Sequence, residues 1–312
     1  MGDVRFEGPI KASTADPNVR RAIDSSILLE VRTKNNTVTA ESGNVVNLTH
    51  AQRQLMGVSD TAQIAVTDSH ALTSAQGLIQ VKAGNKWYTG TIRKLDDKRD
   101  LAFIEINTKD KLPAVNIASG DDLAPGDLVY SVSHPLGTED TVVNGGTFQF
   151  VTSKKWEWGR LDRLFPDPQS GKTLDFAKMY QDKVNTLPGL EKDDAQADWT
   201  RPLLATKLAN KEGGSGGALF NSKGEIAGVL EAVEPNPRMA AKALDTYTPA
   251  AQIRTFADAA PMFKFNYTEK SFTPSGTTAP INVAWFLGFD RIGPDKRPPF
   301  NSSDEIVSKL SK

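Results

Sequence analysis

A serine flanked on both sides by glycine pairs is the segment of this sequence with the clearest chemical potential. The stretch GGSGGALFNSKGEIAGV covers residues 213–229 and places Ser215 among four glycines. Glycines let the backbone turn sharply, so two N–H groups can point at one place beside the serine hydroxyl. Such donors stabilise an oxyanion that develops during acyl transfer. A Gly/Ser-rich linker has the same local composition, but the apolar strand-turn-strand pattern that follows favours an anchored loop.

This segment resembles the nucleophile loop of trypsin-like serine proteases, especially those of the bacterial HtrA/Deg type. In that family a glycine, a variable residue, serine and two glycines precede an apolar strand. The resemblance implies that Ser215 is the nucleophile. It also implies an oxyanion hole at Gly213, Gly214 and Ser215, with the N–H groups of Gly213 and Ser215 as donors. The implied activity is peptide-bond hydrolysis by a serine endopeptidase.

Further segments match this family in the expected order along the chain. DLAFIEI is similar to the strand that carries the acidic member of the family's triad, which assigns that role to Asp100. GDLVYSVSHPLG (126–137) is similar to the segment that opens the second barrel. TYTPAAQIRTF (246–256) is similar to the last strand and the helix after it. The resemblance therefore rests on several short segments and not on one motif.

The position of the catalytic histidine is where this sequence departs from the family. The family places its base at the end of a strand that reads apolar, Leu or Val, Thr, two small residues and His. The segment Ala71-Leu72-Thr73-Ser74-Ala75-Gln76 fits that pattern but ends in glutamine. A carboxamide has no basicity at neutral pH and cannot activate a serine hydroxyl. With Gln76 in this position, Asp100 has no imidazole to orient, and we expect little or no activity.

Other side chains offer alternative bases. His50 would need an extra hairpin before Asp100, and His70 follows a strand in what reads as a tight turn. His134 lies in the turn of the second-barrel segment, where a polar rim residue is the ordinary interpretation. Lys211 stands next to Glu212, which favours an exposed ion pair over a base of lowered pKa.

Three interpretations of function follow from Gln76. The natural protein is an active protease in which this residue was changed, or it is a pseudoprotease that binds peptides or proteins, or a base such as His50 or Lys211 acts instead. By resemblance, Leu230, Glu231 and Ala232 line the substrate cleft, where a peptide can add to the strand edge. If Glu231 faces the cleft, it favours basic side chains; if it faces solvent, it selects nothing.

Short strands separated by turn residues predict an all-β fold of two six-stranded antiparallel barrels. We expect a protease domain over residues 1–257, with a partly helical insertion that has its helix near 172–186, and a C-terminal extension that packs on the domain. Residues 35–50 read as polar and turn-rich, and 71–75 as a return strand. The expected bounds are about 18–110 for the first barrel, 120–257 for the second, 153–205 for the insertion and 258–312 for the extension.

Composition narrows the possible functions. The 312 residues contain no cysteine, which excludes disulfides, thiolate metal sites and cysteine catalysis. A net charge of -1 gives no sign of nucleic-acid binding, and no apolar run is long enough to span a membrane. We expect no cofactor, no metal, and a polypeptide substrate or peptide-like ligand. The family resemblance favours a periplasmic or secreted location after removal of a signal, and a cytoplasmic location stays open.

Overall fold

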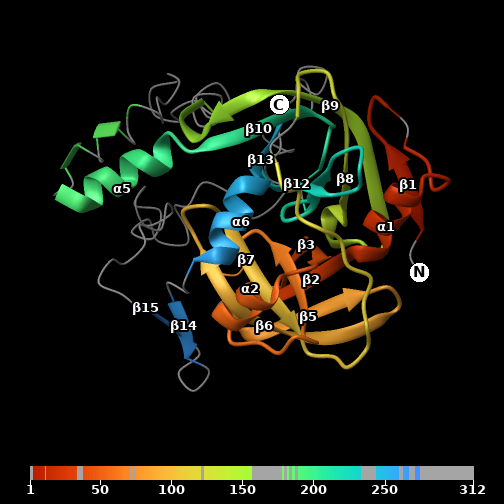
Figure 1. Cartoon of the computed structure of the whole chain (residues 1–312), viewed down its shortest axis with the longest axis horizontal. Coiled ribbons are helices and arrows are strands. Elements are labelled where there is room, and N and C mark those ends of the chain that lie inside the picture. Colours follow the sequence, from red (N-terminus) through yellow and green to blue (C-terminus); the bar gives the residue numbers. More distant parts are fainter. Residues whose placement is uncertain are drawn as a thin grey trace, which may run out of the picture.

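The computed structural model of the chain shows two groups of β-strands, one above the other in Figure 1, with helices at their edges. Every helix in the described part of the chain is too short or too polar to cross a membrane. The structure describes residues 3–10, 12–33, 38–70, 72, 75–120, 123–156, 178, 181–182, 185–186, 189–211, 213–232, 244–259, 263–266 and 271–274.

Six strands of the N-terminal half close into an antiparallel barrel. Successive side chains of a strand point to opposite faces, and Ile27, Leu29 and Val31 of the first strand lie in the barrel core. Around the barrel the order is β2 (Ser26–Thr33), β3 (Val38–Val46), β4 (Gln63–Thr67), β7 (Leu101–Ile106), β6 (Lys86–Asp96) and β5 (Ala75–Ala83).

Six strands of the C-terminal half form a second closed ring. The ring closes because the long β9 pairs with β8 through its first half and with β10 through its second half. Its core contains Phe148, Leu219 and Tyr247. The order is β8 (Leu128–Ser133), β9 (Thr141–Ser153), β10 (Pro202–Lys207), β13 (Asp245–Pro249), β12 (Ile226–Ala232) and β11 (Ala218–Phe220), and β1 (Val4–Glu7) adds to β9 in parallel.

Strand β4 is buried on both faces because it lies between the two barrels. Ala65 points into the core of the first barrel. Ile64 and Val66 point the other way and join a second core, which also contains Val132 of β8 and Phe220 of β11. The chain that leaves β4 therefore emerges at the junction of the barrels, where residues from both halves can meet.

Helices cover the edges of the barrels. α1 (Pro17–Ser25) has a proline in its first turn, and the Asp16 side chain accepts from the Asn18 N–H as its N-cap. α2 (His50–Leu55) begins with a capping box between Thr49 and Gln52. The remaining elements are η1 (Pro135–Gly137), α5 (Gly189–Trp199), α6 (Ala250–Asp258) and a hairpin of β14 (Phe263–Asn266) with β15 (Ser271–Pro274).

A buried lysine fixes the end of α6 on the first barrel. Lys94 of β6 is 2% exposed and donates to the carbonyl oxygens of Phe256 and Ala257, at 2.5 and 3.2 Å. A cation suits the negative end of a helix. Burial lowers the pKa of Lys94 to about 8, against smaller opposing contributions from Asp258 and Asp96.

The two predicted barrels are confirmed, with differences at particular elements. Residues 38–46 form β3 and not a polar loop. The return strand predicted at 71–75 is wrong at Leu72, which lies in a turn, and β5 begins only at Ala75. β10 is a barrel strand, although most of it was assigned to the insertion. The helix expected near 172–186 and residues 275–312 of the extension lie largely or wholly outside the described residues, and the domain bounds stay predictions.

Candidate active site

The loop that carries Ser215 requires glycine at two positions. Gly213 and Gly216 both have φ of +77°, in the left-handed region that side chains rarely adopt. A Cβ on Gly213 would lie 2.4 Å from the nitrogen of Leu136, and one on Gly216 would lie 2.2 Å from the carbonyl oxygen of Ser42. The glycines around Ser215 thus serve close packing, which a flexible linker does not need.

Backbone hydrogen bonds fix this loop to both barrels. The Gly216 N–H donates to the Leu230 carbonyl (3.0 Å), and the Leu230 N–H donates to the Gly217 carbonyl (2.9 Å), which ties the loop to β12. On the other side, the Ser42 N–H of β3 donates to the Ser215 carbonyl (2.8 Å). The Ser42 hydroxyl donates to the Gly213 carbonyl (3.0 Å). The loop is therefore rigid on both sides of the serine.

Three backbone N–H groups lie at or just before Ser215 in the nucleophile loop, and one of them already donates a hydrogen bond within the protein. The Gly214 N–H donates to the carbonyl of Lys211 (3.0 Å), so Gly214 lies in the predicted oxyanion loop without offering a free donor. The N–H groups of Gly213 and Ser215 find no acceptor within the described part of the chain. These two donors fit the predicted oxyanion hole.

Asp100 holds an imidazole, and that imidazole belongs to His70. Nδ1 of His70 lies 2.9 Å from Oδ2 of Asp100. The other carboxylate oxygen accepts from the N–H groups of Ser69 (3.0 Å) and His70 (2.9 Å) and from the Ser69 hydroxyl (3.1 Å). Asp100 is 8% exposed and has φ of +51°, a left-handed conformation uncommon outside glycine that these bonds support. The expectation that Asp100 has no imidazole to orient is wrong.

The pair has the electrostatics of a stabilised ion pair. Burial alone would raise the pKa of Asp100, but His70, with smaller contributions from Lys154 and the Ser69 N–H, holds it well below its usual range. Burial alone would lower the pKa of His70, but Asp100, followed by Asp68 and Glu41, raises it well above its usual value. The His70 side chain is 48% exposed, so a reacting group can reach it.

Gln76 and His50 are two further residues that the sequence analysis considered for the histidine position. Gln76 is the second residue of β5, and its side chain is outside the described residues. His50 contacts Asp60 (Nδ1 to Oδ1, 2.7 Å) and Gln54 on the exposed α2.

His134 and Lys211 are engaged in other ways. His134 is 6% exposed, and burial lowers its pKa to about 4. Lys211 pairs with Glu7 (2.6 Å), and its predicted partner Glu212 lies outside the described residues. Burial of His134 and the ion pair of Lys211 give no support to either side chain as the base.

Sequence reasoning overlooked His70 for a definable reason. Ala65-Val66-Thr67 followed by Asp68, Ser69 and His70 matches the family's strand-end pattern, except that Asp68 stands where a small residue is expected. The same pattern begins again at Ala71, which shifted the alignment by six positions. The signal that identifies His70 is the end of the buried strand β4, whereas Gln76 is the second residue of β5.

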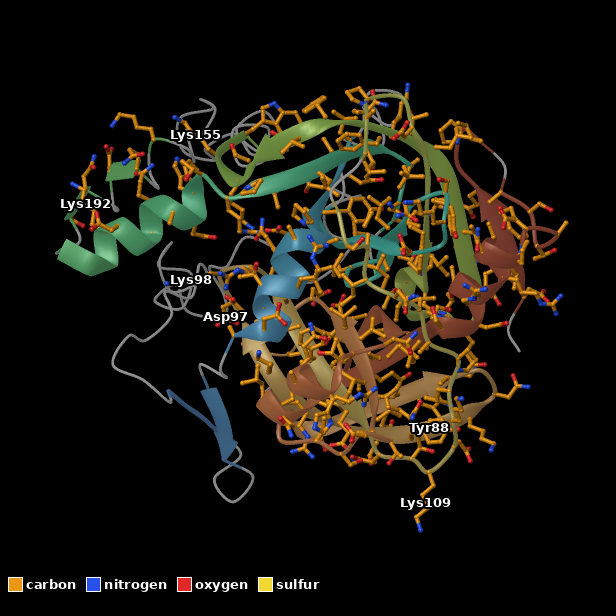
Figure 2. All side chains as sticks on the ribbon, in the orientation of Figure 1. Tyr88, Asp97, Lys98, Lys109, Lys155 and Lys192 are labelled. Atoms are coloured by element: carbon orange, nitrogen blue, oxygen red, sulfur yellow. The ribbon has the colours of Figure 1, made fainter. Side chains whose placement is uncertain are left out.

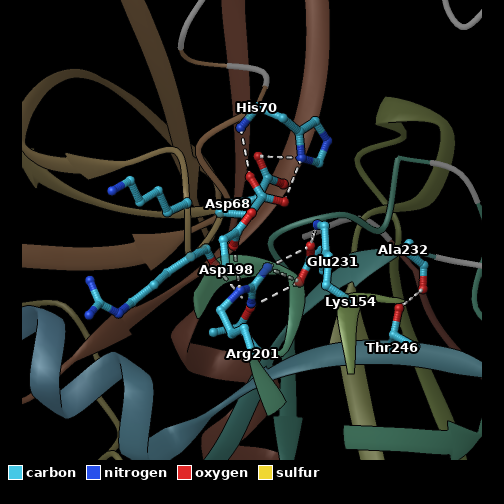
Figure 3. A network of polar contacts seen from close by, with 12 residues as sticks. Asp68, His70, Lys154, Asp198, Arg201, Glu231, Ala232 and Thr246 are labelled. Atoms are coloured by element: carbon cyan, nitrogen blue, oxygen red, sulfur yellow. Dashed lines mark hydrogen bonds and ion pairs between the residues drawn. The ribbon is translucent and has the colours of Figure 1, made fainter. Parts of the chain in front are cut away.

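The predicted substrate-binding residues have different surroundings. Leu230 is buried, and its backbone holds the nucleophile loop. The Glu231 side chain is 4% exposed, so it faces neither open solvent nor an open cleft. Its carboxylate accepts from Nη2 of Arg201 at 2.9 and 3.1 Å and contacts the ammonium of Lys154 (Figure 3). Arg201 also contacts Asp198 (3.2 Å). We call Glu231, Arg201, Lys154 and Asp198 the Glu231 cluster.

Comparison with known proteins agrees with the geometry. A family profile described as a trypsin-like peptidase domain matches residues 55–229, more than half of the chain. Serine protease HTRA1 of Xenopus tropicalis is 25% identical over 166 residues, 53% of this chain and 28% of that protein. A probable periplasmic serine endoprotease, DegP-like, of Buchnera aphidicola is 24% identical over 170 residues, 54% of this chain and 27% of that protein. The chain thus spans under a third of the length of these relatives.

Solved structures share the fold. The Rv3671c protease of M. tuberculosis in its active form superposes with a TM-score of 0.55 at 16% identity, covering 89% of this chain and 91% of that one. The serine endoprotease of Yersinia pestis gives a TM-score of 0.52 at 18% identity, covering 82% of this chain and 71% of that one. At these identities the similarity supports the two-barrel architecture alone.

Proposed function

We propose that this chain, which belongs to the family of trypsin-like peptidase domains, is a serine endopeptidase that cleaves polypeptides through Ser215. The observation that carries the proposal is the hydrogen bond between Nδ1 of His70 and Asp100. This hydrogen bond supports His70 as the general base, a role that the sequence pattern did not indicate. The competing hypothesis, an inactive chain with Gln76 in place of the base, loses its main support because Asp100 already holds an imidazole.

The proposed mechanism assigns one step to each group. Nε2 of His70 accepts the proton of the Ser215 hydroxyl as its oxygen attacks the peptide carbonyl, while Asp100 stabilises the imidazolium through Nδ1. The N–H groups of Gly213 and Ser215 donate to the oxyanion of the tetrahedral intermediate. His70 then gives its proton to the leaving amine, and a water molecule repeats the sequence on the acyl-enzyme to release the acid.

The test is covalent labelling by a fluorophosphonate probe. We expect the chain as it stands to be labelled, and Ser215→Ala and His70→Ala to be unlabelled. Gln76→His is the control for the competing hypothesis, and we expect it to label no faster than the unchanged chain. Strong labelling that appears only after Gln76→His would overturn the proposal in favour of an inactive scaffold. Absence of labelling in all forms would favour a peptide-binding role.

We further propose that Glu231 does not select basic residues in the substrate. Its carboxylate is paired with Arg201 and Lys154, so little of its charge is left for a third cation. Glu231 and Ala232 then act through backbone groups that bind an extended peptide, whereas both backbone groups of Leu230 already bond the nucleophile loop. Cleavage of a peptide library checks this, because preferential cleavage after Lys or Arg would contradict it.

An exported location is the remaining proposal. One relative is described as probably periplasmic, and the chain contains no cysteine that an oxidising compartment could cross-link. Fractionation of cells that express the full-length gene tests the location, and recovery in the cytoplasmic fraction would contradict it.

A further inference from the structure

A second carboxylate lies against the imidazole of His70. Oδ1 of Asp68 is 3.7 Å from Nδ1 of His70, and the Asp68 side chain is fully buried (0% exposed). The neighbouring N–H groups of Ser69 and His70 both donate to Asp100, so they do not serve Asp68. Figure 3 shows Asp68 beside His70 at the end of β4. The ring therefore has two buried carboxylates on the side that carries Nδ1.

The same carboxylate also touches the nucleophile loop. A Cβ on Gly216 would lie 3.0 Å from Oδ2 of Asp68 and 2.2 Å from the hydroxyl of Thr67. Asp68 is thus packed between His70 and the residue that follows Ser215. A side chain in this position affects both the base and the loop that carries the nucleophile.

Glu41 of β3 completes the group. Burial raises the pKa of Glu41 well above its usual value, and the neighbouring charge of Asp68 and a hydrogen bond to it raise it further. Two carboxylates that share a site do not both ionise readily. We therefore place one proton on the pair, carried by Glu41, which leaves Asp68 as the charged member next to the imidazole. We call Glu41, Asp68, His70 and Asp100 the His70 cluster.

Other charged groups nearby interact with Asp100 or with one another and are not among the main contributions to the pKa of His70. Lys154 of β9 lowers the pKa of Asp100. In the loop before β7, burial followed by the charge of Asp100 raises the pKa of Asp97 to about 7, and Asp96 pairs with Arg99. Asp97 and the adjacent Lys98 lie near α6 in Figure 2. From β3 and the end of β4, the groups that face His70 are Glu41 and Asp68.

We propose that Asp68, with Glu41 as the partner that holds its proton, is a positioning residue that sets the proton affinity of His70 and so the lowest pH at which the site works. The inference rests on the proposed protease function, because it is the base of that reaction that is tuned. His70 must be neutral to accept the serine proton. A second negative charge favours the imidazolium, so it moves the acidic limit of activity to higher pH than Asp100 alone would.

Titration of His70 by NMR tests the proposal directly, in the Ser215→Ala background and in buffers with EDTA. We expect Asp68→Asn to lower the titration midpoint of His70 by about one pH unit or more, a tenfold or larger loss of proton affinity. Glu41→Gln should lower the midpoint much less than Asp68→Asn does, because Glu41 contributes less than Asp68 to the raised pKa of His70 and its carboxyl carries the shared proton. Asp60→Asn, which removes the carboxylate beside the exposed His50, is the matched control and should not move His70.

The pH dependence of fluorophosphonate labelling, measured with Ser215 intact, gives the functional readout. The acidic half-point should fall in Asp68→Asn by the same amount as the NMR midpoint. Equal midpoints in Asp68→Asn and the unchanged chain, with both folded, would overturn the proposal. If Asp68→Asn fails to fold, Asp68→Ser carries the same prediction. Absence of labelling at every pH would overturn the protease function, while the NMR shift would still decide the role of Asp68.

Discussion

Two groups of charged side chains, buried except for the half-exposed His70, lie close together near the junction of the barrels (Figure 3). They differ in how their charges balance. In the Glu231 cluster, two carboxylates contact two cations. In the His70 cluster, three carboxyl groups surround one imidazole. Lys154 belongs to the first cluster but also lowers the pKa of Asp100 in the second. The two clusters are therefore neighbours, one with balanced charges and the other with an excess of carboxyl groups.

This difference in charge balance predicts that one cluster contributes to the stability of the fold and the other to the chemistry of the site. A buried pair whose partners are all present keeps its groups in fixed charge states, and losing one partner leaves an uncompensated charge. A cluster with too few cations must instead retain protons, which shifts proton affinities toward the range where catalysis occurs. We expect changes in the Glu231 cluster to alter folding and changes in the His70 cluster to alter activity and its pH dependence.

The largest effect should come from His70→Ala. Loss of the base should lower the turnover of a peptide substrate by roughly 10⁶-fold, the scale seen when another serine protease loses its histidine. The variant should still fold, because the ring is half exposed. Peptide hydrolysis and circular dichroism check the two halves of this prediction. A folded variant that keeps more than a hundredth of the activity would remove His70 from the mechanism.

The next largest effect should come from Arg201→Met. Its removal leaves the buried carboxylates of Glu231 and Asp198 short of one cation, which should cost about 3–5 kcal/mol of unfolding free energy. Denaturant unfolding measures this value. Arg5→Met is the matched control, because Arg5 is 48% exposed beside Asp140 and should cost under about 1 kcal/mol. Similar losses of unfolding free energy in both variants would show that the Glu231 cluster contributes no more to stability than an exposed ion pair does.

Asp97→Asn should change how stability depends on pH. Because the folded-state pKa of Asp97 is raised to about 7, its protonated form contributes stability that is fully present below about pH 4 and is lost as pH rises through 7. The variant lacks this loss, so relative to the unchanged chain it should be more stable at pH 8 than at pH 4. Melting temperatures across this range provide the check, and parallel curves for the two proteins would contradict the prediction.

The smallest effect should come from Asp60→Asn. His50 and Asp60 are as close as His70 and Asp100, but their side chains are 65% and 63% exposed. Exposed pairs contribute little, so we expect a change in unfolding free energy within about 0.5 kcal/mol and no loss of activity. A large effect on labelling would mean that His50 takes part in catalysis, as one interpretation of the sequence allowed.

The sequence predicted most barrel strands because apolar alternation and turn residues mark them. β3 was not predicted, because its buried residues include polar ones that form hydrogen bonds inside the protein. The Asn44 side chain accepts from the Ala218 N–H (3.0 Å) and donates to the Ser25 hydroxyl (3.1 Å). Polar residues that satisfy backbone groups of the other barrel look like loop residues in sequence, since their partners lie far along the chain.

Some residues of the candidate site could likewise be predicted from the sequence and others could not. Ser215 and Asp100 lie in local motifs, whereas His70 was hidden because Asp68 replaces a small residue of the pattern. The state of Glu231 depends on Arg201 and Lys154, which come from the two ends of the insertion and reach it only in the folded chain. Charge compensation across such distances leaves no local trace in the sequence.

The hydrogen bonds of Ser42 affect when, during folding, the loop that carries Ser215 reaches its final shape. Its N–H and hydroxyl, both from β3, hold the carbonyls of Ser215 and Gly213 in the other barrel, more than 170 residues later. Contacts so distant along the chain form late, because their loop-closure entropy must be met first. A half-folded chain, or a C-terminal barrel alone, would keep the bonds to β12 but lack the two from Ser42 that fix the carbonyls of Gly213 and Ser215. The proposed protease activity would then require both folded barrels, so partly folded copies of the chain would not cleave one another.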